Sequence, residues 1–231
     1  MLTVEKLNQY YGESHTLWDL DMQAPEGQCT VLMGRNGVGK TTLLQCIMGL
    51  LPVRGGAIQY QGENLLQYDA ERRANLGIGY VPQGRQIFPL LTVEENLLIG
   101  LPARRDKVRA IPPFIFELFP VLKEMLGRRG GDLSGGQQQQ LAIGRALVLD
   151  PKLLILDEPT EGIQPNIVHE IGGIIRKLNQ EIGLTVLLVE QKLPFARRVG
   201  DRFCILDRGR QVAEGAMATL DEGLVQRYLT V

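Results

Sequence analysis

The sequence predicts an α/β fold whose central sheet is largely parallel and covered by helices. Six runs have the length and apolar pattern of strands: residues 2–7, 29–33, 78–81, 153–156, 185–189 and 203–206. The runs 153–156 and 185–189 are apolar on both faces, as strands buried inside a parallel sheet are. Between them, isoleucines and one leucine recur at helical spacing, so residues 166–182 are predicted to form the helix of a βαβ unit.

Composition and charge exclude several classes of protein. The 231 residues carry 25 Lys and Arg against 26 Asp and Glu, and this near-neutral balance argues against a dedicated nucleic-acid binder. The first residues lack the basic and apolar regions of a signal peptide. The apolar runs also stay far below the roughly 18 residues that a membrane helix needs. We therefore expect a soluble, cytosolic chain, although it could still dock on a membrane protein.

A glycine-rich loop follows the predicted strand 29–33 and precedes a helix predicted from Thr42 to about Leu50. Its sequence, GRNGVGKT, fits the phosphate-binding pattern GxxxxGK[ST] at every fixed position. Glycines let backbone N–H groups turn inward around phosphate, and the start of the following helix adds positive potential. Lys40 is expected to reach the β- and γ-phosphates of a nucleotide, and the Thr41 hydroxyl to bind Mg²⁺.

Two carboxylates end the apolar strand 153–156. Asp157, at the tip of the strand, is expected to hold Mg²⁺, and Glu158 is expected to point toward the attacking water. Acidic residues at strand ends are common, but a functional role for this pair is supported by the phosphate-binding loop in the same chain. Together the two motifs predict a site for nucleotide hydrolysis.

The sequence LSGGQ at residues 133–137 is the most diagnostic stretch. Ser134 can cap a helix while Gly135 and Gly136 leave backbone N–H groups free, which makes a second anion site. With this stretch, essentially the whole chain resembles the ATP-binding subunits of ABC transporters. Residues 133–147 are most similar to the branched-chain amino acid and urea uptake branch. The resemblance implies that LSGGQ closes over ATP held by another subunit, and hence a head-to-tail dimer.

The same resemblance assigns three further positions. Tyr11 matches the aromatic residue that stacks on adenine, and Gln83 matches a glutamine that contacts Mg²⁺ and senses the transmembrane partner. Residues 161–164 occupy the loop that touches the opposite subunit, where Gln164 replaces the usual Asp. Gln191 stands where the wider family usually has a catalytic His, which supports the branched-chain and urea branch. His15 and His169 lie outside every motif and are expected to be solvated.

The resemblance thus gives a full set of expectations. The fold is a P-loop nucleotide-binding domain of ABC type spanning residues 1–231, with an N-terminal antiparallel β portion and a helical subdomain inserted at about residues 84–149. Catalysis is expected to depend on Lys40, Glu158 and Gln191, and Mg²⁺ to bind Thr41, Gln83 and Asp157. The residues expected to contact ATP are Tyr11, Gly34, Arg35, Asn36, Gly37, Val38, Gly39, Lys40, Thr41, Thr42, Gln83, Ser134, Gly135, Gly136 and Gln137.

The expected partners follow from the same family. They are a second ATP-binding subunit, identical or paralogous, transmembrane permease subunits, and indirectly a periplasmic solute-binding protein, with no nucleic acid. The chain is therefore expected at the cytoplasmic face of the inner membrane, bound peripherally. Residues 133–147 and 158–165 favour urea or short-chain amides as the solute, with branched-chain amino acids as the alternative.

Other classes of function fit the sequence less well. A GTPase is expected to carry an NKxD motif, which the sequence lacks, and a small-molecule kinase has no use for LSGGQ. An ABC-type ATPase of DNA repair would place a long coiled coil between the phosphate loop and LSGGQ, where this chain has repeated Pro and Gly without heptads. Translation factors of this type usually carry two cassettes. A non-hydrolysing nucleotide sensor is disfavoured because Lys40, Asp157 and Glu158 are all present.

Overall fold

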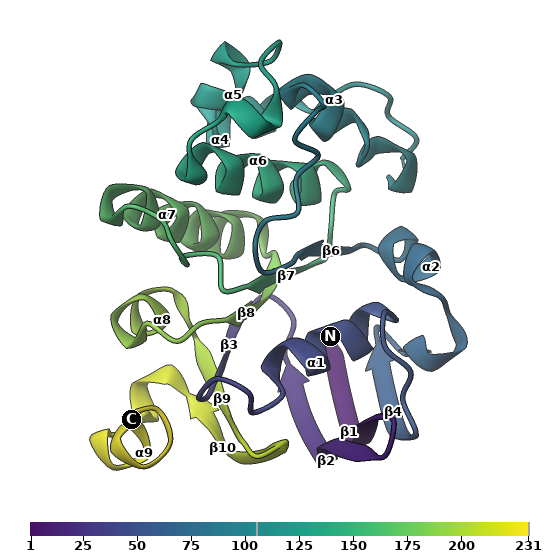
Figure 1. Cartoon of the computed structure of the whole chain (residues 1–231), viewed down its shortest axis with the longest axis vertical. Coiled ribbons are helices and arrows are strands. Elements are labelled where there is room, and N and C mark those ends of the chain that lie inside the picture. The colour runs from purple at the N-terminus through teal and green to yellow at the C-terminus, as the bar shows by residue number, and fades with distance from the viewer. Residues whose placement is uncertain (105, 231) are drawn as a thin grey trace.

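The computed structural model describes residues 1–104 and 106–230, and its sheets divide the chain into an antiparallel and a largely parallel part (Figure 1). The antiparallel sheet has the order β2-β1-β4-β5 and consists of β1 (Leu2–Tyr11), β2 (Ser14–Ala24), β4 (Gly55–Tyr60) and β5 (Glu63–Asn64). The N-terminal antiparallel β portion is thereby confirmed. The strand predicted at residues 2–7 runs four residues further, because it pairs along its length with β2.

The central sheet has the order β10-β9-β3-β8-β7-β6. Five strands run parallel: β3 (Cys29–Met33), β6 (Ile78–Val81), β7 (Leu153–Asp157), β8 (Thr185–Val189) and β9 (Arg202–Asp207). Only the edge strand β10 (Arg210–Ala216) is antiparallel, joined to β9 by a hairpin turn. Every residue of β3, β7 and β8 is buried, which the apolar runs at 153–156 and 185–189 predicted for β7 and β8.

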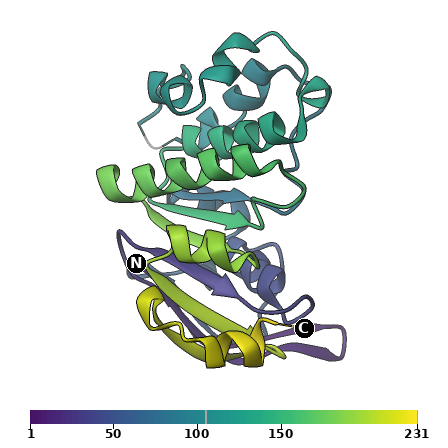
Figure 2. The same ribbon diagram turned by 90° about the vertical axis from the view of Figure 1, so that its left-hand side faces the viewer.

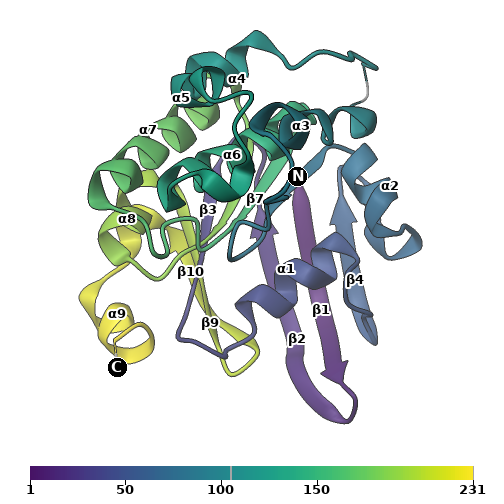
Figure 3. The same ribbon diagram turned by 45° about the horizontal axis from the view of Figure 1, so that its top comes forward.

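Helices cover both faces of the central sheet and form two apolar cores. On one face, α1 (Lys40–Met48) lies between the central and the antiparallel sheet, where Figure 3 shows it crossing β1 and β2. On the other face, α6 (Gly135–Val148), α7 (Pro165–Ile182) and α8 (Leu193–Val199) bury their apolar sides. The predicted helix at 166–182 matches α7 to within one residue. The helix predicted at 42–50 instead begins at Lys40 and ends before Gly49, which adopts the left-handed conformation that terminates helices.

The segment between β6 and β7 is helical and forms the end of the molecule farthest from the antiparallel sheet (Figure 2). It contains α3 (Val93–Leu98), α4 (Pro113–Leu118) and α5 (Pro120–Glu124), packed against α6. The remaining helices are α2 (Ala70–Asn75), after β5, and α9 (Glu222–Tyr228), near the C-terminal end. Within the described residues, no helix is both long and apolar enough to cross a membrane.

Candidate nucleotide site

The phosphate-binding loop connects β3 to α1 in a backbone shape that requires glycine. Gly34 has φ 144°, and a Cβ atom there would lie 2.4 Å from the carbonyl oxygen of Leu206 in β9. Gly39, the residue that caps α1, has φ 105°. Both values lie in a region that other residues rarely adopt. The strand, the loop and the helix are thus arranged as the phosphate-binding pattern requires.

Lys40 turns its ammonium group back into this loop. Its Nζ donates hydrogen bonds to the carbonyl oxygens of Gly34 (2.8 Å) and Arg35 (2.9 Å) and lies 3.9 Å from Oε1 of Glu158. Burial lowers the pKa of the Lys40 ammonium, and the Glu158 carboxylate opposes that shift. The buried cation is therefore held by carbonyl groups of the loop, in a position where a phosphate could replace them.

Asp157 is the least satisfied polar side chain at the site. It ends β7, its side chain is 1% exposed, and neither carboxylate oxygen has a hydrogen-bond partner in the described part of the chain. Burial raises the pKa of Asp157 to about 6, Glu158 adds to the rise, and the nearby Thr41 and Lys40 oppose it. A buried carboxylate without a donor fits a site that gains a cation.

Glu158 and Gln191 contact each other across the site. The Gln191 Nε2 donates to Glu158 Oε1 and, at 2.7 Å, to Oδ1 of Asn36 in the phosphate-binding loop. Glu158 itself has φ 49°, which non-glycine residues rarely adopt, and its N–H donates to the carbonyl of Val189 in β8. Such strain is often stored at functional sites, because it directs a side chain where a relaxed backbone would not.

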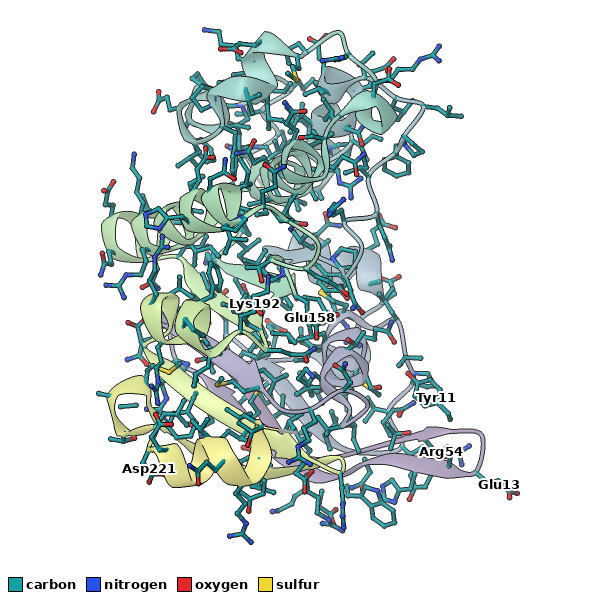
Figure 4. All side chains as sticks on the ribbon, turned by 60° about the vertical axis from the view of Figure 1, so that its left-hand side comes forward. Tyr11, Glu13, Arg54, Glu158, Lys192 and Asp221 are labelled. Carbon is teal, nitrogen blue, oxygen red and sulfur yellow. The ribbon has the colours of Figure 1, made fainter. Side chains whose placement is uncertain are left out.

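These groups surround one open cavity of about 810 Å³. Of the residues singled out from the sequence, twelve line it: Tyr11, Asn36, Gly37, Gly39, Lys40, Thr41, Thr42, Gln83, Glu158, Glu161, Gly162 and Gln191. Asp157 lies beneath this surface, and Arg35 points away from it, donating to the carbonyl of Thr230. Figure 4 shows Glu158 and Lys192 in the middle of the molecule and Tyr11 farther out, toward the β1–β2 hairpin.

Tyr11 and Gln83 both line the cavity but have different neighbours. Tyr11 ends β1, has 49% of its surface exposed, and places its hydroxyl 3.4 Å from Oγ1 of Thr42, so its ring is free to stack on a base. The Gln83 side chain donates to Glu161 Oε2 at 2.9 Å and to Glu158 Oε2 at 3.4 Å. Gln83 is therefore engaged with carboxylates rather than with Thr41 or Asp157.

The LSGGQ stretch lies outside this cavity. Ser134 caps α6: its Oγ accepts from the Gln137 N–H at 3.4 Å, and the Gln137 side chain accepts from the Ser134 N–H at 2.9 Å. Ser134 thus caps a helix as expected, and the structure adds the return bond from Gln137 that makes a reciprocal capping box. Gly135 and Gly136 form the first turn of α6, beside Arg85 and Ile167 respectively. None of these described residues lines the cavity around Lys40.

Four further residues line the cavity without a role assigned from the sequence: Thr16, Thr160, Glu190 and Lys192. Glu190, 2% exposed, accepts from the Thr160 hydroxyl at 2.7 Å and from the backbone N–H groups of Gln191 and Lys192. Lys192 in turn donates to the carbonyl oxygen of Thr160 at 2.8 Å. These bonds fix the backbone that presents Gln191. A buried acid directly after an all-apolar strand was the signal available in the sequence.

One expectation about the histidines is wrong. His15 is half buried, its ring stacked between Tyr10 and Trp18 with centroid separations of 4.0 and 3.6 Å. It is therefore part of an aromatic cluster on the β1–β2 hairpin and not a solvated residue. His169 is exposed, as expected, and contacts Arg198.

Comparison with known proteins places the chain in a family. A family model described as "ABC transporter" matches residues 17–161. The chain is 42% identical to the high-affinity branched-chain amino acid transport ATP-binding protein BraG of Pseudomonas aeruginosa, over 95% of this chain and 94% of that protein. It is 38% identical to the probable branched-chain amino acid transport ATP-binding protein LivF of Archaeoglobus fulgidus, over 96% and 94%.

A solved structure agrees with the sequence relatives. An ATP-binding cassette determined as a dimer in a post-hydrolysis state, with ADP and phosphate bound, superposes with a TM-score of 0.83 at 27% identity, over 94% of this chain and 99% of that one. The fold is that of an ABC nucleotide-binding domain, as the sequence predicted. The chain therefore belongs to the ATP-binding subunits of ABC transporters and is a transport ATPase.

Proposed function

We propose that this chain hydrolyses MgATP in a head-to-tail dimer and thereby drives the import of branched-chain amino acids. The observation that supports it most directly is the convergence of Lys40 and Glu158 in one cavity beside the phosphate-binding loop, with the buried Asp157 next to Glu158 at the end of the same strand. The permease subunits and an external solute-binding protein would complete the transporter. The ATPase itself would work at the cytoplasmic face of the membrane, as a peripheral subunit.

The chain's own residues divide the work of hydrolysis. The Lys40 ammonium would exchange the carbonyls of Gly34 and Arg35 for phosphate oxygens and offset their charge. Glu158 would accept a hydrogen bond from the attacking water and polarise it. Gln191 would donate a hydrogen bond toward the γ-phosphate. It already holds Glu158 and Asn36, so it also fixes the distance between the loop and the water-directing carboxylate.

Mg²⁺ fits the residues present. Asp157 offers two buried oxygens without donors, and Thr41 starts α1 beside the phosphate loop. When bound, Mg²⁺ would neutralise charge on the transferred phosphate group. No group of three His, Cys, Asp or Glu side chains suited to a metal occurs among the described residues. That agrees with Mg²⁺, which usually takes one or two protein ligands and otherwise phosphate oxygens and water. Gln83 would have to leave Glu161 to join them.

The second half of the site would come from a second subunit. The start of α6 presents the amides of Gly135 and Gly136 and the positive end of a 14-residue helix, but it does not border its own chain's cavity. A head-to-tail partner would bring this helix start over the γ-phosphate. The relative solved with ADP and phosphate is described as a dimer, which supports the same arrangement here.

The relatives favour branched-chain amino acids as the solute. BraG and LivF cover almost the whole chain at 42% and 38% identity, and both are described as branched-chain amino acid transport proteins. Urea and short-chain amides are the second candidate, because residues 133–147 and 158–165 resemble the urea branch. Nothing in the nucleotide cavity touches the solute, so the choice depends on the partner subunits.

Reconstitution tests the proposal. We would place the ATPase in liposomes with the permease and solute-binding proteins encoded beside it, and follow ATP hydrolysis and solute uptake. Leucine, isoleucine or valine is expected to stimulate both, and Glu158→Gln to abolish both. Stimulation by urea but not by leucine would replace branched-chain amino acids with the second candidate. If the protein hydrolysed no ATP at any Mg²⁺ concentration, the proposed chemistry would be wrong.

A further inference from the structure

The hairpin turn between β9 and β10 lies against the phosphate-binding loop. Its two central residues, Arg208 and Gly209, have φ values of 46° and 75°, and Asp207 pairs with Arg210 across the turn. Two-residue turns with both φ values positive suit the twist of a β-hairpin. Arg208 is exposed, but Gly209 is buried. A buried turn tip is unusual, because turns normally lie on the surface.

Gly209 makes two backbone hydrogen bonds, one to the phosphate-binding loop and one to β2. Its N–H donates to the carbonyl oxygen of Val38, in the phosphate-binding loop, at 3.0 Å. Its own carbonyl oxygen accepts from the N–H of Trp18, in β2, at 2.9 Å. The neighbour of Trp18 along the strand is Leu17, whose side chain would lie 2.6 Å from a Cβ atom on Gly39. The turn therefore joins the phosphate-binding loop to the β1–β2 hairpin that carries Tyr11.

The first of these bonds fixes the direction of one amide group. In a trans peptide, the C=O of one residue and the N–H of the next point in opposite directions. The Val38 carbonyl is directed at Gly209, so the N–H of Gly39 is directed away from the turn, and Gly39 lines the cavity. We propose that Gly209 is a positioning residue for nucleotide binding, which holds the Val38–Gly39 peptide so that the Gly39 amide faces phosphate. This rests on the nucleotide site proposed above.

No larger residue would fit in the place of Gly209. A Cβ atom there would lie 2.0 Å from the carbonyl oxygen of Thr16 and 3.0 Å from Cδ1 of Trp18. The Thr16 carbonyl belongs to the backbone, so the turn would have to move away, and its N–H would lose the Val38 carbonyl. The peptide could then rotate. The nucleotide would then lose the hydrogen bond from the Gly39 amide to a charged phosphate group, and its affinity is predicted to fall by about tenfold or more.

The chain contains a matched control. The β4–β5 hairpin also has a two-residue turn with both φ values positive, Gln61 at 51° and Gly62 at 85°, and Tyr60 pairs with Glu63 across it. A Cβ atom on Gly62 would meet nothing within 4 Å, and the turn does not border the nucleotide cavity. Gly62→Ala therefore introduces the same backbone strain as Gly209→Ala without touching the phosphate-binding loop.

Binding and steady-state kinetics test the proposal. For Gly209→Ala we expect the Kd for MgADP, measured by calorimetry, and the KM for ATP to rise about tenfold or more, with kcat within about twofold of the parent. Gly62→Ala should keep the parent Kd and KM. A Gly209→Ala protein with a parent-like Kd, or a lower kcat at unchanged KM, would overturn the proposal. A parent protein that fails to bind MgADP would instead overturn the proposed function.

A second measurement needs no variant, in case Gly209→Ala does not fold. In the parent protein, hydrogen exchange at the Gly209 amide is expected to slow when MgADP is added. Phosphate binding would hold the Val38–Gly39 peptide in place, and the Gly209 N–H donates to the carbonyl oxygen of that peptide. The Gly62 amide should exchange at the same rate with and without MgADP. Equal exchange at Gly209 in both conditions would contradict a role in nucleotide binding.

Discussion

The cavity around Lys40 and the start of α6 are both suited to phosphate, but they are organised differently. In the cavity, Glu158 contacts both Lys40 and Gln191, and Gln191 also bonds to Asn36 in the phosphate-binding loop. At the start of α6, Ser134 and Gln137 bond to each other, and neither borders the cavity. The first region is close to a complete catalytic site, whereas the second lacks a ligand on its own chain. The difference supports the proposal that each chain carries half of each of two sites.

The largest effect is expected in the cavity, from Glu158→Gln. The amide keeps the size of the carboxylate but cannot polarise water as a carboxylate does, so kcat should fall by roughly 10²- to 10⁴-fold. ATP binding should survive, and the dimer should persist because ATP is not consumed. Rapid-quench hydrolysis and size-exclusion chromatography with ATP measure the two outcomes. Turnover at the parent rate would remove Glu158 from the mechanism.

A comparable loss of hydrolysis is expected when a negative charge is placed at the start of α6 without disturbing the helix. Asp and Asn are both good N-caps, so Ser134→Asp and Ser134→Asn should both fold. Only Asp sets a carboxylate against the γ-phosphate of the partner, and like charges brought together cost several kcal/mol, so hydrolysis should fall by about 10²-fold or more. Binding of ATP to the monomer should match that of the Asn control. If monomer binding falls equally, the segment serves its own chain's site.

A smaller loss of activity is expected from substitutions of Gln191, which contacts Glu158 in the cavity. Removing one preorganised donor by Gln191→Ala should lower kcat by roughly 10²-fold while the KM for ATP changes little. Gln191→His should retain activity but add a pH dependence between about pH 6 and 7, where an imidazole titrates and an amide does not. Steady-state rates from pH 5.5 to 8.5 would show both effects. Parent-like turnover by Gln191→Ala would show that Gln191 takes no part in hydrolysis and that Glu158 directs the water without it.

The smallest effect concerns stability and Asp157. Burial raises the folded-state pKa of Asp157 to about 6, so the metal-free protein loses stability as pH rises from about 4 to 6, where the unfolded chain ionises first. Asp157→Asn removes that penalty and should raise the free energy of unfolding at pH 8 by about 1–3 kcal/mol, with little change at pH 4. Urea unfolding in EDTA measures it. An equal shift at both pH values would show that ionisation is not the cause.

Sequence and structure agree best where periodicity is strong. The strands at residues 29–33, 78–81 and 185–189 were predicted with the bounds observed, because all-apolar runs between polar turns define both ends. The strands β2 and β4 were not individually predicted. They lie half exposed in the antiparallel sheet, where polar residues interrupt the pattern and pairing with β1 decides the extent.

The same holds for the site. Spacing in the sequence was enough to find Lys40, Asp157 and Glu158, since a loop and a strand end carry them. The bonds from Glu190 to Thr160 and from Gln83 to Glu161 join residues about 30 and 78 positions apart, and only the folded chain brings them together. The environment of His15 was not predicted because Tyr10 lies opposite it only once β1 and β2 pair as a hairpin.

The central claim, that each chain completes its partner's site, is tested most directly by mixing two inactive proteins. Glu158→Gln chains retain an intact α6 start, and Ser134→Asp chains retain an intact cavity, so a mixed head-to-tail dimer contains one site with no substitution. The two proteins would be combined before ATP is added, and hydrolysis compared with the sum of the separate rates. We predict activity well above that sum. No gain on mixing would mean that each α6 start serves its own chain, and would contradict the account.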